Sequence, residues 1–306
     1  MHTSVKFWMK TTRSQVLPVM VLPVLIGAAG AFAVYETFHL GLFLLTLIGA
    51  LSAHLFSNMI NDLWDFRNGV DIAAEETAAA ISTNSRVLPS GTVPERTFAF
   101  VTWLFFFIAL LCGVVISAFV GWTVLLFAAA GGAIAYFYVA PPLKFGYRGK
   151  GYSEVAIFLA FGVLPVVGTY YVLTEQLDLQ AFMMSVPIGI LTTLILFNHH
   201  FLHWQADEAS GKKTLVVVLG EKGALRFSKV LASLGFFSII VGIVFGAFPW
   251  YTVLAIIPAI PLFKVYPSFN DTNANESYVK LMSASLKASV RSGLIITICL
   301  IISGLL

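Results

Sequence analysis

The chain has 306 residues, of which 58% are hydrophobic and only 11% are charged, and its mean hydropathy is +0.89. Soluble globular proteins carry about 25% charged residues, so this composition excludes a water-soluble globular surface and indicates a protein of the lipid bilayer. The net charge is only +3 and no pattern typical of nucleic-acid binding accompanies it, so we expect no nucleic-acid partner.

Nine apolar blocks follow one another along the chain, each long enough to cross a hydrocarbon core roughly 30 Å thick. Because lipid offers no hydrogen-bond partners, each block has to pair its backbone groups internally, which predicts a helix. The blocks cover 14–35, 39–60, 95–117, 121–139, 152–173, 180–202, 224–246, 249–265 and 289–306. The predicted fold is therefore all-α, a single polytopic membrane domain over 1–306 with nine transmembrane helices.

The segments that connect these blocks alternate in charge. One set, counted with the adjoining helix ends, holds all 18 basic residues, and the other set holds none. The basic set is the N-terminus with 61–94, 140–151, 203–223 and 266–288, and the other set is 36–38, 118–120, 174–179 and 247–248. Since basic segments stay in the cytoplasm, we expect a cytoplasmic N-terminus and an external C-terminus in the cell membrane.

A polar run closes the second block. It reads Asn58-Met59-Ile60-Asn61-Asp62-Leu63-Trp64-Asp65-Phe66-Arg67-Asn68-Gly69-Val70-Asp71. On a helix, Asn58, either Asn61 or Asp62, and Asp65 share one face, because residues three and four apart are neighbours. That face offers only oxygen ligands, which suit Mg²⁺ bound through one or two carboxylates and substrate phosphates. Ionisable groups at the membrane boundary are costly and usually functional, which favours a site over a solvated helix end.

A second polar run closes the sixth block. It reads Asn198-His199-His200-Phe201-Leu202-His203-Trp204-Gln205-Ala206-Asp207-Glu208-Ala209-Ser210-Gly211-Lys212-Lys213-Thr214. His199, His203 and Asp207 stand four residues apart, so we expect one stripe along a continuous helix. Both runs lie at helix ends on the cytoplasmic side, where they can face each other across a shared cavity. Two acidic helix ends with lysines close by are what a Mg²⁺-bound diphosphate requires.

These runs carry a family resemblance. Asn61-Asp62-x-x-Asp65-Phe66-x-x-Gly69-x-Asp71 resembles the first aspartate-rich motif of the UbiA superfamily of membrane prenyltransferases. The spacing from Asp65 to Asp71 is most similar to the 1,4-dihydroxy-2-naphthoate branch of menaquinone biosynthesis. Further similar motifs extend the resemblance over most of the chain: Arg86-Val87-Leu88-Pro89-Ser90-Gly91, Tyr138-x-x-Pro141-Pro142-x-Lys144, Gly149 to Glu154, Phe161-Gly162 to Gly168-Thr169-Tyr170-Tyr171, and Asp207-x-x-x-Gly211-Lys212-x-Thr214-Leu215.

The resemblance implies nine helices around a central cavity and Mg²⁺-dependent transfer of an isoprenoid chain from a prenyl diphosphate to an aromatic acceptor. The segments 66–94 and 203–223 become cytoplasmic active-site loops. The implied metal ligands are Asn61, Asp62, Asp65 and Asp207, and the implied diphosphate ligands are Lys144, Arg148, Lys212 and Arg67. The implied catalytic residues are Asp65, Asp71, His203 and Tyr138, and the candidates for a general base are Asp71, Glu154 and His203.

The second motif departs from the family pattern, which is usually Asp-x-x-x-Asp. His203 stands where the first aspartate is expected, and Asp207 stands at the second position. Histidine suits softer metals than Mg²⁺. Either the metal is held by fewer protein ligands, or His203 donates directly to the diphosphate or the acceptor.

Other functions remain open at this stage. Within the family, 4-hydroxybenzoate and a glycerol-phosphate lipid are alternative acceptors. A transporter also combines broken helices with membrane carboxylates, although it would hold its substrate near the bilayer midplane. A di-metal oxygenase would use the cluster His199-His200-x-x-His203, but the chain has only six histidines and such sites need roughly eight.

Overall fold

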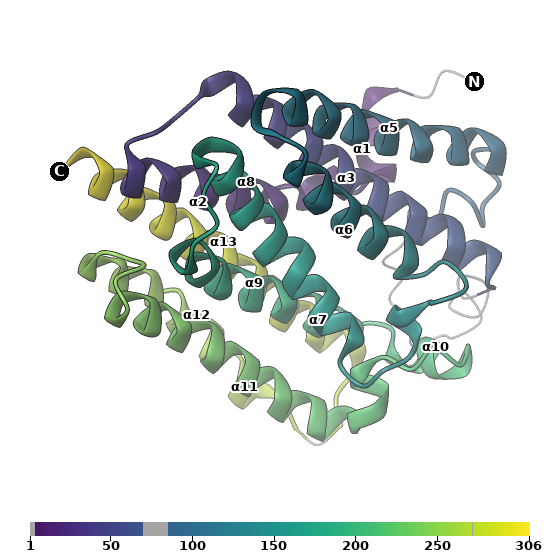
Figure 1. Ribbon diagram of the computed structural model, residues 1–306. Coiled ribbons are helices and arrows are strands. Elements are labelled where there is room, and N and C mark those ends of the chain that lie inside the picture. Colours follow the sequence, from purple (N-terminus) through teal and green to yellow (C-terminus); the bar gives the residue numbers. More distant parts are fainter. Residues whose placement is uncertain (1–3, 70–84, 271) are drawn as a thin grey trace.

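The computed structural model describes residues 4–69, 85–270 and 272–306, and helices are the regular secondary structure in these ranges, without a β-strand (Figure 1). The α-helices in chain order are α1 (Val5–Thr11), α2 (Pro18–Tyr35), α3 (Leu40–Arg67), α5 (Glu95–Val120), α6 (Thr123–Phe137), α7 (Tyr152–Phe158), α8 (Leu164–Thr174), α9 (Leu179–His200), α10 (Trp204–Ala209), α11 (Leu215–Val244), α12 (Ala259–Phe263) and α13 (Asn275–Leu305). The expectation of an all-α membrane fold is confirmed.

Eight helical stretches in the described ranges are long and apolar enough to cross a membrane. One of them joins α7, a π-helical turn over Leu159–Val163 and α8 into a single span. Another combines the 3₁₀ segment Trp250–Ile256 with α12. The one expected span without such a helix is the fourth block, 121–139. It corresponds to α6, which is apolar but has only 15 residues. The chain is an integral membrane protein, and the count of nine spans stays a prediction.

Two helices begin earlier than their apolar blocks. The seventh block was expected from 224, whereas α11 starts at Leu215, where the Thr214 side chain caps the backbone N–H of Val217 at 3.4 Å. The last block was expected from 289, whereas α13 starts at Asn275. The early part of α11, residues 215–219, is apolar but is separated from the rest of the helix by a non-helical Gly220 with φ 65°. The early part of α13 is polar, and hydropathy detects only the part of a helix that meets lipid. The predicted loop 203–223 accordingly contains α10 and the first turns of α11.

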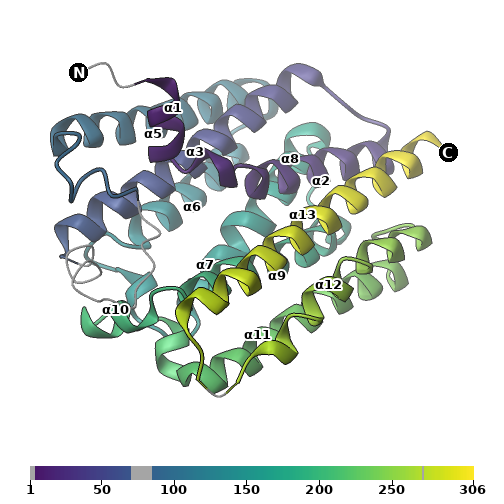
Figure 2. The same ribbon diagram turned by 180° about the vertical axis from the view of Figure 1, so that it is seen from behind.

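The two ends of the helix bundle differ. In both views the C-terminal end of α3 lies at the same end as α10 and the N-terminus, and the C-terminus of the chain lies at the opposite end (Figures 1 and 2). The polar runs of α3 and α9 therefore meet at one end of the bundle, as the sequence predicted.

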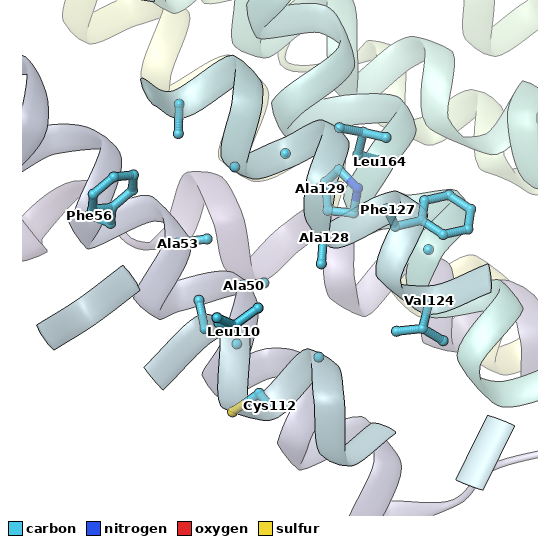
Figure 3. A pocket seen from close by; sticks show the side chains of 18 of the residues that line it. Ala50, Ala53, Phe56, Leu110, Cys112, Val124, Phe127, Ala128, Ala129 and Leu164 are labelled. Carbon is cyan, nitrogen blue, oxygen red and sulfur yellow. The ribbon is translucent and has the colours of Figure 1, made fainter. Parts of the chain in front are cut away.

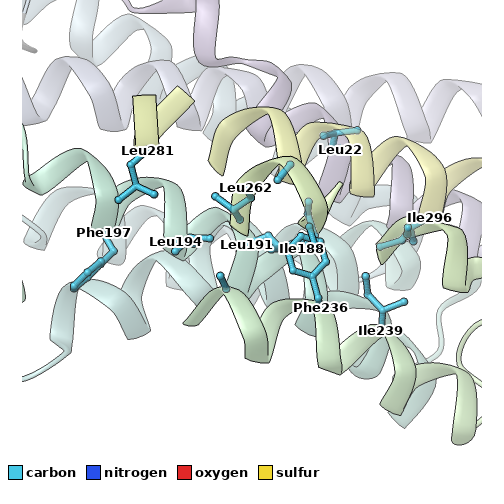
Figure 4. Close-up of a cluster of buried hydrophobic side chains, with 14 of the residues drawn as sticks. Leu22, Ile188, Leu191, Leu194, Phe197, Phe236, Ile239, Leu262, Leu281 and Ile296 are labelled. Atoms are coloured by element: carbon cyan, nitrogen blue, oxygen red, sulfur yellow. The ribbon is translucent and has the colours of Figure 1, made fainter. Parts of the chain in front are cut away.

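The largest buried apolar cluster joins α2, α9, α11 and α13 (Figure 4). Ile188 and Leu191 of α9, Phe236 of α11 and Ile296 of α13 belong to this cluster. Towards the α10 end of this cluster, Asn198 of α9 donates to the hydroxyl of Ser285 at 2.7 Å. Buried polar bonds of this kind hold membrane helices together where lipid removes the hydrophobic driving force. α10 follows α9 and precedes α11, so these two packed helices hold both of its ends.

A contact between two glycines fixes α7 and the π turn against α9. A Cβ atom added at Gly162 would lie 2.5 Å from the Cα atom of Gly189, so the two backbones approach too closely for any side chain. Small residues allow such close approach in membrane bundles. The contact sets the position of α7, whose first turn borders the site described next.

Candidate active site

The polar side chains at the end of α3 point in two directions. Asn58 Nδ2 donates to the backbone oxygen of Thr12 at 3.2 Å. Asp62 is buried, pairs with the guanidinium of Arg13 and accepts the backbone N–H of Ser85 at 3.1 Å through Oδ2. This face of α3 therefore holds the N-terminal segment, and both carboxylate oxygens of Asp62 are engaged there.

Asp65 lies on the neighbouring face of α3, where it contacts two residues that are distant in the sequence, Tyr147 and Lys212. The hydroxyl of Tyr147 donates to Asp65 Oδ1. Lys212 Nζ lies 3.6 Å from Asp65 Oδ2 and 3.8 Å from Asp207 Oδ1. The same ammonium stands 5.0 Å from the centre of the Tyr147 ring, a cation–π contact. Lys212 thus bridges the acidic ends of the two polar runs.

Asp207 reaches this bridge by a route that the sequence did not reveal. The stripe His199, His203, Asp207 was expected on one helix, but α9 ends at His200 and α10 begins at Trp204. His203 has left the helical region, with φ −146°, and no glycine or proline marks the break. The expectation of a continuous helix was wrong, because tertiary contacts turn the chain where it leaves the membrane.

The histidines nevertheless stay close to the acidic cluster. The rings of His199 and His203 have centroids 5.0 Å apart, and His203 Nε2 lies 3.6 Å from Asp207 Oδ2. Burial lowers the pKa of His203 well below its usual value, and Lys212 lowers it further. His203 is therefore neutral at pH 7 and contacts Asp207 as a polar neighbour.

The charges of the bridge influence one another. Burial acts to lower the pKa of Lys212, but Asp65 and Asp207 outweigh it, so the pKa is raised and the ammonium stays charged. Burial raises the pKa of Asp207 to about 7, and Lys212 only partly offsets this. A carboxylate with such a pKa gains from any further cation that approaches it.

The predicted diphosphate ligands divide into two groups. Lys212 lies in the cluster, and Lys144 lies beside it, donating to Asn68 Oδ1 at 2.7 Å. Arg67 is bound to the Glu95 carboxylate at 2.7 Å on the surface. Arg148 is exposed and reaches the backbone oxygen of Pro142 at 3.4 Å.

Two tyrosines border the cluster. Tyr138, predicted as catalytic, packs edge-on against Phe145, and burial raises the pKa of its hydroxyl to about 12. Tyr147 was not singled out from the sequence, although it contacts both Asp65 and Lys212. Its only signal was its place between Lys144 and Arg148. Asp71, another predicted catalytic residue, lies outside the described residues.

Oxygen atoms near the bridge lack hydrogen bonds. Within the described ranges, Asn61 Oδ1 and both carboxylate oxygens of Asp207 are buried without a hydrogen-bond partner, although Asp207 lies within ion-pair distance of Lys212 and His203. Buried polar atoms without partners mark a place for a ligand, an ion or water. Oxygen donors suit Mg²⁺, which needs only one or two carboxylates when phosphate completes its shell. The side chains present therefore fit a Mg²⁺ ion that arrives with a diphosphate.

The histidine cluster does not form a metal centre of its own. Among the residues that the structure describes, no group of three or more His, Cys, Asp or Glu side chains is placed to hold a metal.

An apolar cavity of about 690 Å³ opens between α3, α5, α6 and α8 (Figure 3). Ala53 and Phe56 of α3 line it on one side, with Ala128 of α6 and Leu164 of α8 across from them. Tyr136 and Phe137, directly before Tyr138, line it as well. The cavity lies in the apolar part of the bundle, and its lining ends one residue before Tyr138, which borders the polar cluster. Such a cavity suits a hydrocarbon chain.

The sequence pattern that defines the UbiA prenyltransferase family matches residues 20–305. The chain belongs to the UbiA prenyltransferase family. It is a membrane prenyltransferase by this membership, and the transporter alternative is no longer supported.

Individual UbiA relatives agree with this assignment. A 2-carboxy-1,4-naphthoquinone phytyltransferase of Synechocystis sp. is 28% identical over 92% of this chain and 89% of its own length. A 1,4-dihydroxy-2-naphthoate octaprenyltransferase of Bacillus subtilis is 27% identical over 95% of this chain and 91% of that protein. A UbiA homologue from Archaeoglobus fulgidus bound to GPP and Mg²⁺ superimposes with a TM-score of 0.66 at 16% identity, covering 95% of this chain and 99% of that one. The UbiA-type fold is thus confirmed.

Proposed function

We propose that this enzyme transfers an isoprenoid chain from a prenyl diphosphate to 1,4-dihydroxy-2-naphthoate, a step of menaquinone biosynthesis. The observation that carries the proposal is the Lys212 bridge between Asp65 and Asp207. It gathers carboxylates and an ammonium, and the same bundle holds an apolar cavity whose lining includes Tyr136 and Phe137. The two together match a diphosphate with a hydrocarbon tail. Relatives that act on naphthoates support this choice of acceptor.

The diphosphate would be held by two positive charges, a Mg²⁺ ion and the Lys212 ammonium. Asn61, Asp65 and Asp207 are the proposed ligands of Mg²⁺, and we leave Asp62 out because Arg13 and Ser85 occupy it. A bound Mg²⁺ would neutralise the negative charge that gathers on the diphosphate as it leaves. The Lys212 ammonium, which compensates two carboxylates in this structure, would turn to the phosphate oxygens.

Transfer begins when the bond between the allylic carbon and the diphosphate oxygen breaks, with its electron pair going to the diphosphate. Lys144 and Lys212 are placed to stabilise that charge. Tyr138 and Tyr147 border the cluster, and the faces of their rings suit the remaining allylic cation. The acceptor ring then forms the new carbon–carbon bond, and the carboxylate at that carbon departs as carbon dioxide.

The orientation in the bilayer follows from the charges. We propose that the end with the Lys212 bridge faces the cytoplasm together with the N-terminus, and that the C-terminus lies outside. The basic connecting segments and the opposite placement of the two termini support this arrangement.

An assay of the purified protein in detergent tests the function. It supplies Mg²⁺, a series of prenyl diphosphates, and three separate acceptors: 1,4-dihydroxy-2-naphthoate, 4-hydroxybenzoate and glycerol phosphate. We expect Mg²⁺-dependent prenylation of the naphthoate, at a kcat/KM well above that for the other two acceptors. Preference for either of the others would overturn the choice of acceptor, and a reaction that persists with excess chelator would overturn the metal.

A further inference from the structure

Glu154 is a buried carboxylate that the site described above does not use. It lies in the first turn of α7, and only 8% of the residue is exposed. Both carboxylate oxygens lack a hydrogen-bond partner in the parts of the chain that the structure covers. Leaving a buried carboxylate unpaired costs stability, and ionisable groups at the membrane boundary usually serve function. We therefore expect the Glu154 carboxylate to form a hydrogen bond with a bound ligand.

The depth of Glu154 can be read from a contact between two helices that run in opposite directions. His54 of α3 meets Phe161, which follows α7, with ring centroids 5.0 Å apart. Seven residues from this contact towards the α10 end lead to Asn61 on α3 and to Glu154 on α7, about 10 Å along each helix. Asn61 and Glu154 therefore lie at about the same level of the bundle.

That level lies between the diphosphate site and the apolar cavity. Asp65 is one turn further towards the α10 end, about 6 Å beyond Asn61. In the other direction, Phe56 of α3 and Ala160 of the π turn line the cavity. A molecule held by Glu154 would therefore stand between the leaving diphosphate and the hydrocarbon chain, where the new bond forms.

The backbone around Glu154 is held firmly. The Gly162–Gly189 contact fixes α7 against α9. Thr193 of α9 donates to the backbone oxygen of Gly189 at 2.8 Å and lies 3.5 Å from the backbone oxygen of Glu154. Glu154 also borders the cluster electrostatically, since it adds to the rise in the pKa of Tyr138 that burial dominates. The carboxylate is thus presented from a rigid element, as ligand recognition requires.

We propose that Glu154 accepts a hydrogen bond from a ring hydroxyl of the aromatic acceptor and so places the ring between Asp65 and the apolar cavity. The proposal rests on the proposed function, because it assumes a hydroxylated aromatic acceptor. Another base candidate, His203, lies 3.6 Å from Asp207 through its Nε2 atom.

Glu154→Gln tests the role, because it keeps the shape of the side chain and removes the charge. A hydrogen bond to a charged group is stronger than one to a neutral group, so we expect kcat/KM for the naphthoate to fall about tenfold. The KM for the prenyl diphosphate and its Mg²⁺ dependence should not change. Glu208→Gln is the matched control, because Glu208 is exposed on α10, and it should leave all constants unchanged.

A second comparison uses an acceptor whose ring hydroxyl is methylated. In the wild type, kcat/KM should be lower for the methylated acceptor than for the hydroxylated one. In Glu154→Gln this difference should be much smaller, because the hydrogen bond from the ring hydroxyl to the Glu154 carboxylate is already absent. Equal losses in both proteins would overturn the role of Glu154 while leaving the proposed function intact. If the wild type prenylates no hydroxylated aromatic acceptor, both the proposed function and the Glu154 proposal fail.

Thermal unfolding provides a readout without turnover. The acceptor should raise the Tm of the wild type and of Glu208→Gln, but shift that of Glu154→Gln much less. Without ligand, Glu154→Gln should be at least as stable as the wild type, because it removes an unpaired buried carboxyl group. A clear loss of stability would indicate a structural partner for Glu154 and would overturn the proposal.

Discussion

Lys212 Nζ lies 3.6 Å from Asp65 Oδ2, although the two residues belong to segments that are far apart in the sequence. The contact joins the last turn of α3 to the segment between α10 and α11. Because the same ammonium also lies 3.8 Å from Asp207, one cation compensates two buried carboxylates. This arrangement is what a diphosphate with a divalent cation would replace, and four predictions follow from it and its surroundings.

Replacing Asp65 by alanine should abolish transfer. The carboxylate is the proposed Mg²⁺ ligand from α3, and loss of one electrostatic group of this kind lowers kcat by about a hundredfold or more. The variant should still fold and insert, as gel filtration in detergent would show. Glu175→Gln, which changes an exposed carboxylate outside the cluster, serves as the control. Normal transfer by Asp65→Ala would remove this residue from the mechanism.

Lys212→Met should lower the thermal stability of the protein without ligand and increase the rise in Tm that Mg²⁺ causes. Removing one partner from a buried charge cluster costs on the order of 3 kcal/mol, so the Tm without ligand should fall. Since two carboxylates then lack a cation, Mg²⁺ alone should raise the Tm more than it does in the wild type. The adjacent Lys213 is exposed, and Lys213→Met should behave like the wild type. An unchanged response of Lys212→Met to Mg²⁺ would contradict the bridge.

Asp62→Asn should reduce stability without changing the Mg²⁺ requirement. Asp62 pairs with Arg13 and Ser85, so its substitution loosens the N-terminal segment. Arg13→Gln should cost a similar amount, and the double variant should cost less than the two single variants together. Should Asp62→Asn instead need much more Mg²⁺ for half-maximal transfer, Asp62 would return to the set of metal ligands.

Gly162→Ala should destabilise the bundle, because the added Cβ would lie 2.5 Å from the Cα of Gly189. Overpacking of this kind costs about 1–3 kcal/mol, measurable as a lower midpoint in thermal unfolding. Gly113→Ala is the matched change, since its Cβ would meet only Ala128 at an ordinary 3.5 Å. A Gly162→Ala variant as stable as Gly113→Ala would mean that α7 is not fixed by this contact.

The sequence by itself determined the class of the fold and the location of the site. Apolar blocks of this length have one physical solution in lipid, a helix, because no other structure pairs the backbone within the segment. The polar runs at 58–71 and 198–214 stood out because polar groups are costly at the membrane boundary. Both facts depend only on composition along the chain.

Only the tertiary structure decided which side chains serve the site. Asn61 and Asp62 are one residue and about 100° apart on the helix, so the packing of the N-terminal segment turned Asp62 to Arg13 and left Asn61 facing inward. The break after His200 and the contact of Tyr147 with Asp65 likewise arise from segments distant in sequence. The direction of a side chain depends on what packs beside its helix, and no local pattern of residues contains that information.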